Sequence, residues 1–471
     1  ALMFRFNNPD ALLTLLMALG AYAVRRSVER GSARWFALSG VLIGLGFLTK
    51  TLQVMLVVPA FGLAYVLFAN TTLRRRVLGA LGGVAAMVVS AGWWVAIVEL
   101  VPASMRPYIG GSQTNSFLEL TFGYNGLGRI NGTEAGSVGP NSGTGTIWRM
   151  FESSIGGQIS WLLPTSLIFL LMGLVMRGRA PRTDLRRAAY VVFGGWLVVT
   201  ALTFSLMEGI FHEYYTVALA PAIAAVVGMG AWDAWQRRQD AIGSVTLAAG
   251  TAAAATWGFI LLSRTTAYGG WLRFTVLALG MACAFLFLVI SRVHRRAVPF
   301  IVGGALVAGL LGPAAYSLST VSSAHSGSIV TAGPNTGGGP GGGQAQGGMG
   351  GLLNGTSPTS DVVTALQKDA SSYTWVAAAV GSQNAAGLQL GAQEPVMAIG
   401  GFNGSDPSPT LAQFQAYVTA GQIHYFLAGG GFGGQNGGSS VANEINSWVS
   451  ANYTQVTIGS YTFYDLTQPL A

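Results

Sequence analysis

The sequence carries very little charge for its length. Only 9% of its 471 residues are charged, and 51% are hydrophobic, whereas a soluble domain usually carries about 25% charged residues. It has a single cysteine, Cys283, so no disulfide can form within the chain and no cysteine-based metal site can be built. Much of the chain must therefore lie in lipid.

Long apolar runs fill the first two thirds of the chain. A membrane-spanning helix needs about 20 apolar residues, and the sequence predicts ten such helices. We expect the first two to be tilted or partly interfacial, because their runs are short. The predicted helices cover roughly 10–24, 35–48, 52–69, 77–98, 157–176, 188–206, 214–232, 243–262, 271–290 and 298–316.

Basic residues collect in every second gap between these runs. This pattern is typical of a multi-pass membrane protein, and the positive-inside rule makes the basic side cytoplasmic. Both ends of the chain are then expected outside, and the net charge of +8 does not indicate nucleic-acid binding. The clusters are Arg25, Arg26, Arg30 and Arg34; Arg74, Arg75 and Arg76; Arg177, Arg179, Arg182, Arg186 and Arg187; Arg237 and Arg238; and Arg292, Arg295 and Arg296.

Polar residues gather at the opposite, external ends of the helices. Asp10 follows Asn7, Asn8 and Pro9, and by position alone it is either an N-terminal cap or part of a site. Lys50 ends the second run, where a lysine can also simply extend its ammonium toward water.

Two further external segments carry polar side chains. The loop 100–156 is long for a compact domain and contains Arg129; such a loop is either functional or a solvated loop with some interfacial helix. The turn "FSLMEGIFHEYYTV" crowds His212, Glu213 and Tyr214 between two helices. Together with the helix ends, these segments could form a polar, partly basic cavity at the outer membrane surface.

Three of these stretches resemble a known family. "RFNNPDALLTLLMALGAYA", "GVLIGLGFLTKTLQVMLVVPAFGLAYVLF" and "FSLMEGIFHEYYTVALAPAIAAVVG" resemble the dolichyl- or polyprenyl-phosphate-mannose mannosyltransferases. These form glycosyltransferase family 39 of the C-type superfamily, which also includes aminoarabinose transferases. The segment "VMAIGGFNGSDPSPTLAQFQAYVTAGQIHYFLAGGG" resembles the C-terminal domain of bacterial YkcA/YkcB-like mannosyltransferases.

The resemblance implies an inverting transfer of a sugar, expected to be mannose, from a polyprenyl-phosphate donor. A carboxylate takes the proton of the acceptor hydroxyl, and cations neutralise the departing phosphate. Asp10 matches an acid of the family pattern and is the expected catalytic residue. The main acidic motif of the family is expected upstream of Ala1, in sequence that this fragment lacks. The expected substrate-binding residues are Arg5, Lys50, Arg129, His212, Glu213 and Tyr214.

The rest of the chain divides into a linker and a small domain. We expect a membrane domain over 1–316, a flexible Gly/Ser-rich linker over 317–359 and an extracytoplasmic α/β domain over 360–471. In the last part, helical and strand patterns alternate, which predicts a small parallel-type sheet with helices on its faces. Its carboxylates outnumber its one base, Lys368, so it should be soluble.

Gly-rich segments follow two of the predicted strands, at 400–407 and 429–438. They serve either as turns or as a surface that contacts a glycan or acceptor, because ligands bind beyond the carboxyl ends of such strands. The expected contact residues are Asn403, Asp406, Gln435 and Asn436.

Two classes of function remain open at this point. One is a membrane glycosyltransferase of the bacterial plasma membrane, with an extracytoplasmic glycan or protein as acceptor. The other is a transporter or scaffold that displays a glycan-binding module. Transporters place ionisable groups near the bilayer midplane, whereas here they gather at the rim, which favours the transferase. The sequence indicates no certain cofactor, and a divalent metal is the one addition that this chemistry could use.

Overall fold

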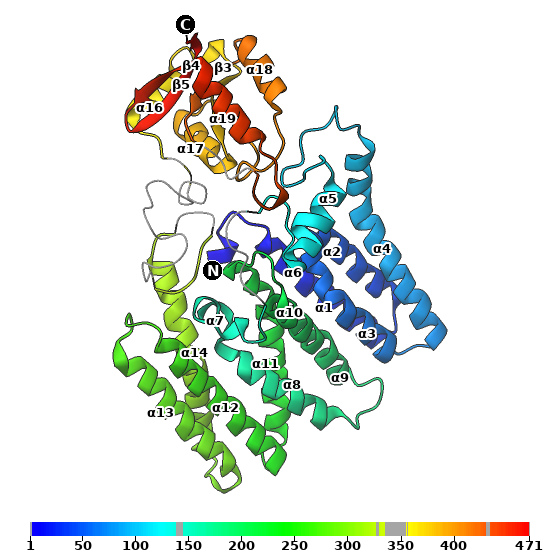
Figure 1. Ribbon diagram of the computed structural model, residues 1–471. Coiled ribbons are helices and arrows are strands. Elements are labelled where there is room, and N and C mark those ends of the chain that lie inside the picture. The colour runs from blue at the N-terminus through cyan, green and yellow to red at the C-terminus, as the bar shows by residue number, and fades with distance from the viewer. Residues whose placement is uncertain are drawn as a thin grey trace.

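The computed structural model describes residues 2–137, 145–325, 329–334, 355, 357–429 and 434–470. It consists of a large helical membrane domain and a small sheet-containing domain at one end of it (Figure 1). Within the described residues, nine helical segments are long and apolar enough to cross a membrane. The prediction of a multi-pass helical protein with a small C-terminal α/β domain is confirmed.

The helices of the membrane domain are close to the predicted runs and mostly longer. α1 and α2 have 21 and 18 residues, so the expectation of two unusually short helices was wrong. The helices are α1 (Asp10–Arg30), α2 (Ala33–Lys50), α3 (Val58–Phe68), α4 (Leu73–Leu100), α7 (Ser153–Ile159), α8 (Leu163–Arg177), α9 (Leu185–Ala189), α10 (Gly195–Leu206), α11 (Ala220–Gln236), α12 (Ala241–Leu262), α13 (Gly269–Leu288) and α14 (Val298–Ser322).

One of the nine segments crosses the membrane twice. Residues 33–68 form a continuous apolar stretch, but the backbone reverses at Thr51, which has a φ of 38°. At that reversal Lys50 binds Asp10, at the start of α1. After α3, the Asn70 N–H donates to the carbonyl of Val28, near the end of α1. The described segments therefore make ten crossings, as the sequence predicts, and both ends of the membrane domain lie on the same side.

The outer loop, residues 101–152 between α4 and α7, lies on that side. It contains two short helices, α5 (Phe117–Phe122) and α6 (Gly128–Asn131). Figure 1 shows α5 and α6 above the ends of α1 and α2, facing the C-terminal domain. The loop is therefore placed between the two domains.

The C-terminal domain is a five-stranded sheet with helices on both faces. Its helices are α16 (Ser360–Gln367), α17 (Ser382–Ala392), α18 (Leu411–Thr419) and α19 (Val441–Asn452), and its strands are β1 (Trp375–Val380), β2 (Val396–Ile399), β3 (Ile423–Leu427), β4 (Tyr453–Ile458) and β5 (Tyr461–Pro469). α16 and α17 pack in one apolar cluster with the sheet, and α18 and α19 pack in another. The order is β2-β1-β3-β5-β4.

The predicted parallel-type sheet is only partly correct. β2, β1 and β3 are parallel, but β5 pairs antiparallel with both β3 and β4. β4 and β5 are joined by Gly459 and Ser460, with Gly459 at a φ of 58°. A two-residue connection permits only a hairpin, because parallel neighbours need a crossover of a dozen or more residues. α14 extends to Ser322, past the predicted boundary at 316, and most of the predicted linker lies outside the described residues.

Candidate active site

A cavity of about 730 Å³ lies where the outer loop, the helix ends and the C-terminal domain meet. Its size is within the range of small-molecule sites, roughly 300–1,000 Å³. Most of its lining comes from the membrane domain, including Asp10, Lys50 and Arg129. Ser382, Gly401, Phe402, Asn403, Ser405 and Asp406 of the C-terminal domain complete the lining.

Asp10 and Lys50 form an ion pair at the bottom of this cavity. The Lys50 Nζ lies 2.8 Å from Asp10 Oδ1 and 2.7 Å from Oδ2. Asp10 is fully buried, and Lys50 is 18% exposed. Asp10 is the first residue of α1, where the Asn8 Oδ1 accepts its N–H. The carboxylate therefore binds an ammonium instead of capping the helix.

Aromatic side chains surround the ammonium of Lys50. Its Nζ lies 4.1 Å from the ring centroid of Tyr215 and 5.2 Å from that of Tyr214. The His212 ring stacks on Tyr214 at 5.5 Å. Burial, with the nearby charges of Arg129 and Lys50, lowers the pKa of His212 to about 4. The imidazole is therefore neutral at pH 7 and adds no charge to the site.

A second cation, Arg129, enters the cavity from α6. Its Nη1 lies 3.7 Å from Glu134 Oε1 and donates to the Ile210 carbonyl at 3.3 Å. Its guanidinium lies 4.6 Å from the ring centroid of Tyr124. Glu134 is 1% exposed and also accepts the Ile210 N–H at 2.6 Å. Glu134 thereby connects the outer loop to the turn before α11 and fixes the position of Arg129.

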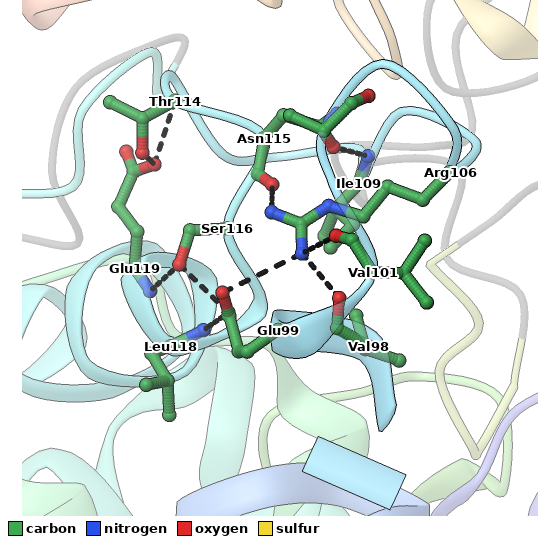
Figure 2. A network of polar contacts seen from close by, with 11 residues as sticks. Val98, Glu99, Val101, Arg106, Ile109, Thr114, Asn115, Ser116, Leu118 and Glu119 are labelled. Atoms are coloured by element: carbon green, nitrogen blue, oxygen red, sulfur yellow. Dashed lines mark hydrogen bonds and ion pairs between the residues drawn. The ribbon is translucent and has the colours of Figure 1, made fainter. Parts of the chain in front are cut away.

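A polar network stabilises the first part of the outer loop (Figure 2). Arg106 donates to the carbonyls of Val98 and Asn115 and lies 3.6 Å from Glu99. Glu99 Oε1 accepts from the Ser116 hydroxyl and the Leu118 N–H, each at 2.9 Å. These contacts tie the loop to the end of α4. They hold Gly110 and Gly111 at the edge of the cavity.

The C-terminal domain contacts the outer loop through the residues expected to bind an acceptor. Asp406 Oδ2 accepts the Gly111 N–H at 2.9 Å, and the Asn403 side chain donates to the Gly136 carbonyl at 2.8 Å. The Asn436 side chain donates to the Ser137 carbonyl at 2.9 Å. Asn403 and Asp406 are 5% and 2% exposed. The polar groups of these two residues therefore hold the two domains together. They do not form the free contact surface that the sequence predicts.

The structure brings together most of the predicted site residues. Asp10, Lys50, Arg129, His212 and Tyr214 all line the cavity, with Asn403 and Asp406 opposite. Arg5 and Gln435 are exposed, and neither they nor Glu213 line it. Tyr124 and Tyr215, which belong to the two external segments expected to form the cavity, also line it, and Phe402 lines it without having been predicted.

The divalent metal that the sequence left open has no evident ligand set in the described part of the chain. No group of three or more His, Cys, Asp or Glu side chains there is arranged to hold an ion. Of the two acids in the cavity lining, Asp10 is bound by Lys50 and Asp406 accepts the Gly111 N–H. The residues present therefore do not fit a metal centre.

Comparison with known proteins gives two matching families and two similar proteins. Residues 1–95 match the family "Dolichyl-phosphate-mannose-protein mannosyltransferase", and residues 362–452 match "Putative mannosyltransferase YkcB-like, C-terminal". "Putative mannosyltransferase YkcB" of Bacillus subtilis (strain 168) is 29% identical to this chain. The alignment covers 96% of this chain and 74% of that protein. "Putative mannosyltransferase YycA" of the same strain is 28% identical, covering 97% and 77%. No solved structure matches the chain.

These matches decide between the two classes of function left open by the sequence. Both families and both relatives carry the name of a mannosyltransferase, which favours the transferase over the transporter or scaffold. The apolar helices make it a multi-pass membrane protein. The chain is therefore a membrane glycosyltransferase that is similar to mannosyltransferases, and its residues 362–452 match the YkcB-like C-terminal domain.

Proposed function

We propose that this glycosyltransferase moves a sugar from a polyprenyl-phosphate donor to an acceptor on the extracytoplasmic side, with inversion at the sugar. The observation that carries the proposal is the grouping of Asp10, Lys50 and Arg129 in the lining of one cavity. A buried carboxylate beside two cations suits a reaction that removes a proton and releases a phosphate.

In the proposed step, the acceptor hydroxyl attacks the anomeric carbon of the sugar from the face opposite the phosphate. The new carbon–oxygen bond forms as the bond from that carbon to the phosphate oxygen breaks. The hydroxyl proton passes to the Asp10 carboxylate, and the electron pair of the broken bond leaves with the polyprenyl phosphate. Lys50 and Arg129 bind this phosphate through charge-assisted hydrogen bonds.

Lys50 has a second part in this proposal. Both oxygens of Asp10 now accept from its ammonium, which has three donors. A donor phosphate between Lys50 and Arg129 would draw the ammonium away from Asp10. The carboxylate would then be free to accept the proton of the acceptor only when the donor is bound.

The orientation belongs to the same proposal. The Arg-rich ends of the helices are assigned to the cytoplasm of a bacterium by the positive-inside rule. The cavity and the C-terminal domain then face outward, and the polyprenyl chain of the donor lies in the bilayer beside the helix ends. The acceptor is an extracytoplasmic glycan or protein.

The test is turnover of polyprenyl-phosphate-mannose by the full chain in lipid nanodiscs, measured as released polyprenyl phosphate. Lys50→Ala should raise the KM for the donor, and Asp10→Asn should lower kcat by about 10²–10⁴-fold, the usual contribution of a general base. Lys368→Ala, at an exposed lysine of the C-terminal domain, is the matched control and should behave as wild type. Wild-type turnover by both Asp10→Asn and Lys50→Ala would refute the proposal.

A further inference from the structure

The C-terminal domain forms one wall of the cavity. Gln113 of the outer loop donates from its side chain to the Ser405 carbonyl at 3.3 Å. The Gly136 N–H donates to the Asn436 carbonyl at 3.1 Å. With the bonds of Asp406 and Asn403 described above, these contacts hold the loop 400–406 and the segment around Asn436 against the outer loop. Any ligand that fills the cavity must therefore touch both domains.

Glycines make this contact sterically specific. A Cβ on Gly438 would lie 2.8 Å from the Cα of Gly136 and 2.8 Å from the Ser405 Cβ. A Cβ on Gly136, whose φ is 76°, would lie 2.6 Å from the Ser405 hydroxyl. Real side chains do not approach so closely, so the two backbones meet where only glycine fits. The outer loop and the C-terminal domain thus meet in a close-packed contact.

Phe402 is the apolar member of this wall. It is 44% exposed, while its neighbour Asn403 is 5% exposed, and it lines the cavity. The tight turn beside it depends on Gly401, at a φ of 67°, where a Cβ would lie 2.0 Å from Asp406 Oδ2. The turn therefore keeps a half-exposed aromatic residue in the cavity lining, although burial elsewhere would be more favourable for it.

The two walls of the cavity differ in charge. Among the described lining residues, the cations Lys50 and Arg129 both come from the membrane domain, and the C-terminal domain contributes no base. A phosphate is therefore held by the membrane domain. On the opposite wall the polar groups of Asn403, Ser405 and Asp406 are buried in the contact between the domains, which leaves Phe402 and the half-buried Ser382 to meet a ligand. An aromatic residue beside a hydroxyl suits a neutral polyhydroxy compound, because the C–H face of a sugar ring packs on the electron-rich face of an arene.

We propose that the C-terminal domain supplies the acceptor side of the cavity and that Phe402 is a specificity-determining residue, stacking on a sugar ring of the acceptor. The inference rests on the proposed function for the position of the donor phosphate. It gives the C-terminal domain a direct contact with the substrate and makes the acceptor a glycan.

The first test compares Phe402→Ala, Phe402→Tyr and Leu390→Ala in the full chain, with polyprenyl-phosphate-mannose as donor and methyl α-mannoside as acceptor. Phe402→Ala should raise the KM for the mannoside about threefold to tenfold, the value of one aromatic contact, and leave the KM for the donor unchanged. Phe402→Tyr, which keeps an aromatic ring, should have the wild-type KM for the mannoside. Leu390, 70% exposed and not part of the cavity lining, is the matched control and should not change either constant.

The second test does not depend on turnover. 4-Fluorophenylalanine is placed at position 402, and the fluorine resonance is followed during titration with methyl α-mannoside or with the donor. A saturable shift with the mannoside supports the proposal. No shift with the mannoside, or a shift caused by the donor alone, would overturn it. Release of polyprenyl phosphate by the wild-type chain is measured separately, so failure of the proposed function is distinguished from failure of this inference.

Discussion

At the scale of single residues, the Asp10–Lys50 pair is the central feature of the site. The two residues lie 40 positions apart in the chain and meet because α1 and α2 are antiparallel neighbours. Asp10 is fully buried, so each charge of the pair is stabilised there only while the other is present. Removing one partner of a buried pair costs up to about 3–5 kcal/mol, because the other charge stays buried and unpaired.

We therefore expect Asp10→Asn and Lys50→Met each to lower the unfolding temperature of the chain clearly. The double variant should be more stable than either single variant, since it leaves no unpaired charge. Unfolding is read from the reaction of a thiol dye with Cys283, the single cysteine, which is 4% exposed in the folded protein. Lys368→Met is the control. A double variant no more stable than the worse single variant would show that the pair is not energetically coupled.

At the scale of elements, α2 and α4 pack through glycines. A Cβ on Gly40 would lie 2.1 Å from the Gly83 carbonyl oxygen, and one on Gly83 would lie 2.5 Å from the Phe36 ring. Such small residues let helix backbones approach closely in a membrane, where packing and not apolar burial drives association. Because α2 carries Lys50 at its end, this contact also positions the site.

Gly83→Ala should therefore destabilise the protein and reduce transfer, because the added methyl group forces α2 and α4 apart. Gly82→Ala, one position earlier on the same helix, is a matched control, since nothing lies within 4 Å of a Cβ there. Alanine is also the better helix former, so Gly82→Ala should be neutral or slightly stabilising. Both effects are measured as unfolding temperature and donor turnover in nanodiscs. Equal behaviour of the two variants would contradict the close packing of α2 on α4.

At the scale of the whole molecule, the contact between the two domains should depend on pH through Asp406. Burial raises the pKa of Asp406 to about 6, with the Gly111 N–H acting in the opposite direction and Glu119 adding to the rise. The docked state then binds the proton more tightly than a separated state with an ordinary pKa of 3.8. Docking of the two domains is strongest below about pH 4 and weakens as the pH rises from there through about 6. Above that pH the free energy of docking is less favourable by on the order of 2–3 kcal/mol.

Spin labels on Met105→Cys and Leu390→Cys, with Cys283→Ala, would measure this equilibrium as an interdomain distance distribution. Both positions are exposed, at 77% and 70%. We expect a narrower distribution at pH 5 than at pH 8. Asp406→Asn should keep the narrow distribution at both values, since an amide oxygen can still accept the Gly111 N–H. If the distance distribution of Asp406→Asn is also broader at pH 8 than at pH 5, another group controls docking.

The orientation of the molecule is tested by labelling exposed positions in intact cells. Ser263→Cys, between α12 and α13, and Ser450→Cys, in α19, should react with a membrane-impermeant thiol reagent. Thr183→Cys, between α8 and α9, should react only after the cells are opened. All three positions are exposed, and the native Cys283 is buried. The reverse labelling pattern would place the cavity in the cytoplasm and contradict the proposed function.

Several features of this protein could be predicted from its sequence because they depend on local composition. Apolar runs of spanning length and alternating basic gaps predict ten crossings, since lipid leaves backbone groups no alternative to helices. The β/α alternation after residue 360 predicts every strand of the C-terminal sheet. The motif residues at the helix ends predict Asp10, Lys50 and Tyr214 as members of one site.

Only the tertiary structure decided how these parts meet. The Asp10–Lys50 pair, the position of β5 between β3 and β4, and the burial of Asn403 and Asp406 all depend on contacts between distant segments. The alternation within a strand does not specify which strand pairs with it. The sequence of a polar loop is also the same whether the loop faces water or another domain. Composition therefore determined which residues enter the membrane. Packing between segments decided which charges pair and which aromatic residue of the C-terminal domain lines the cavity.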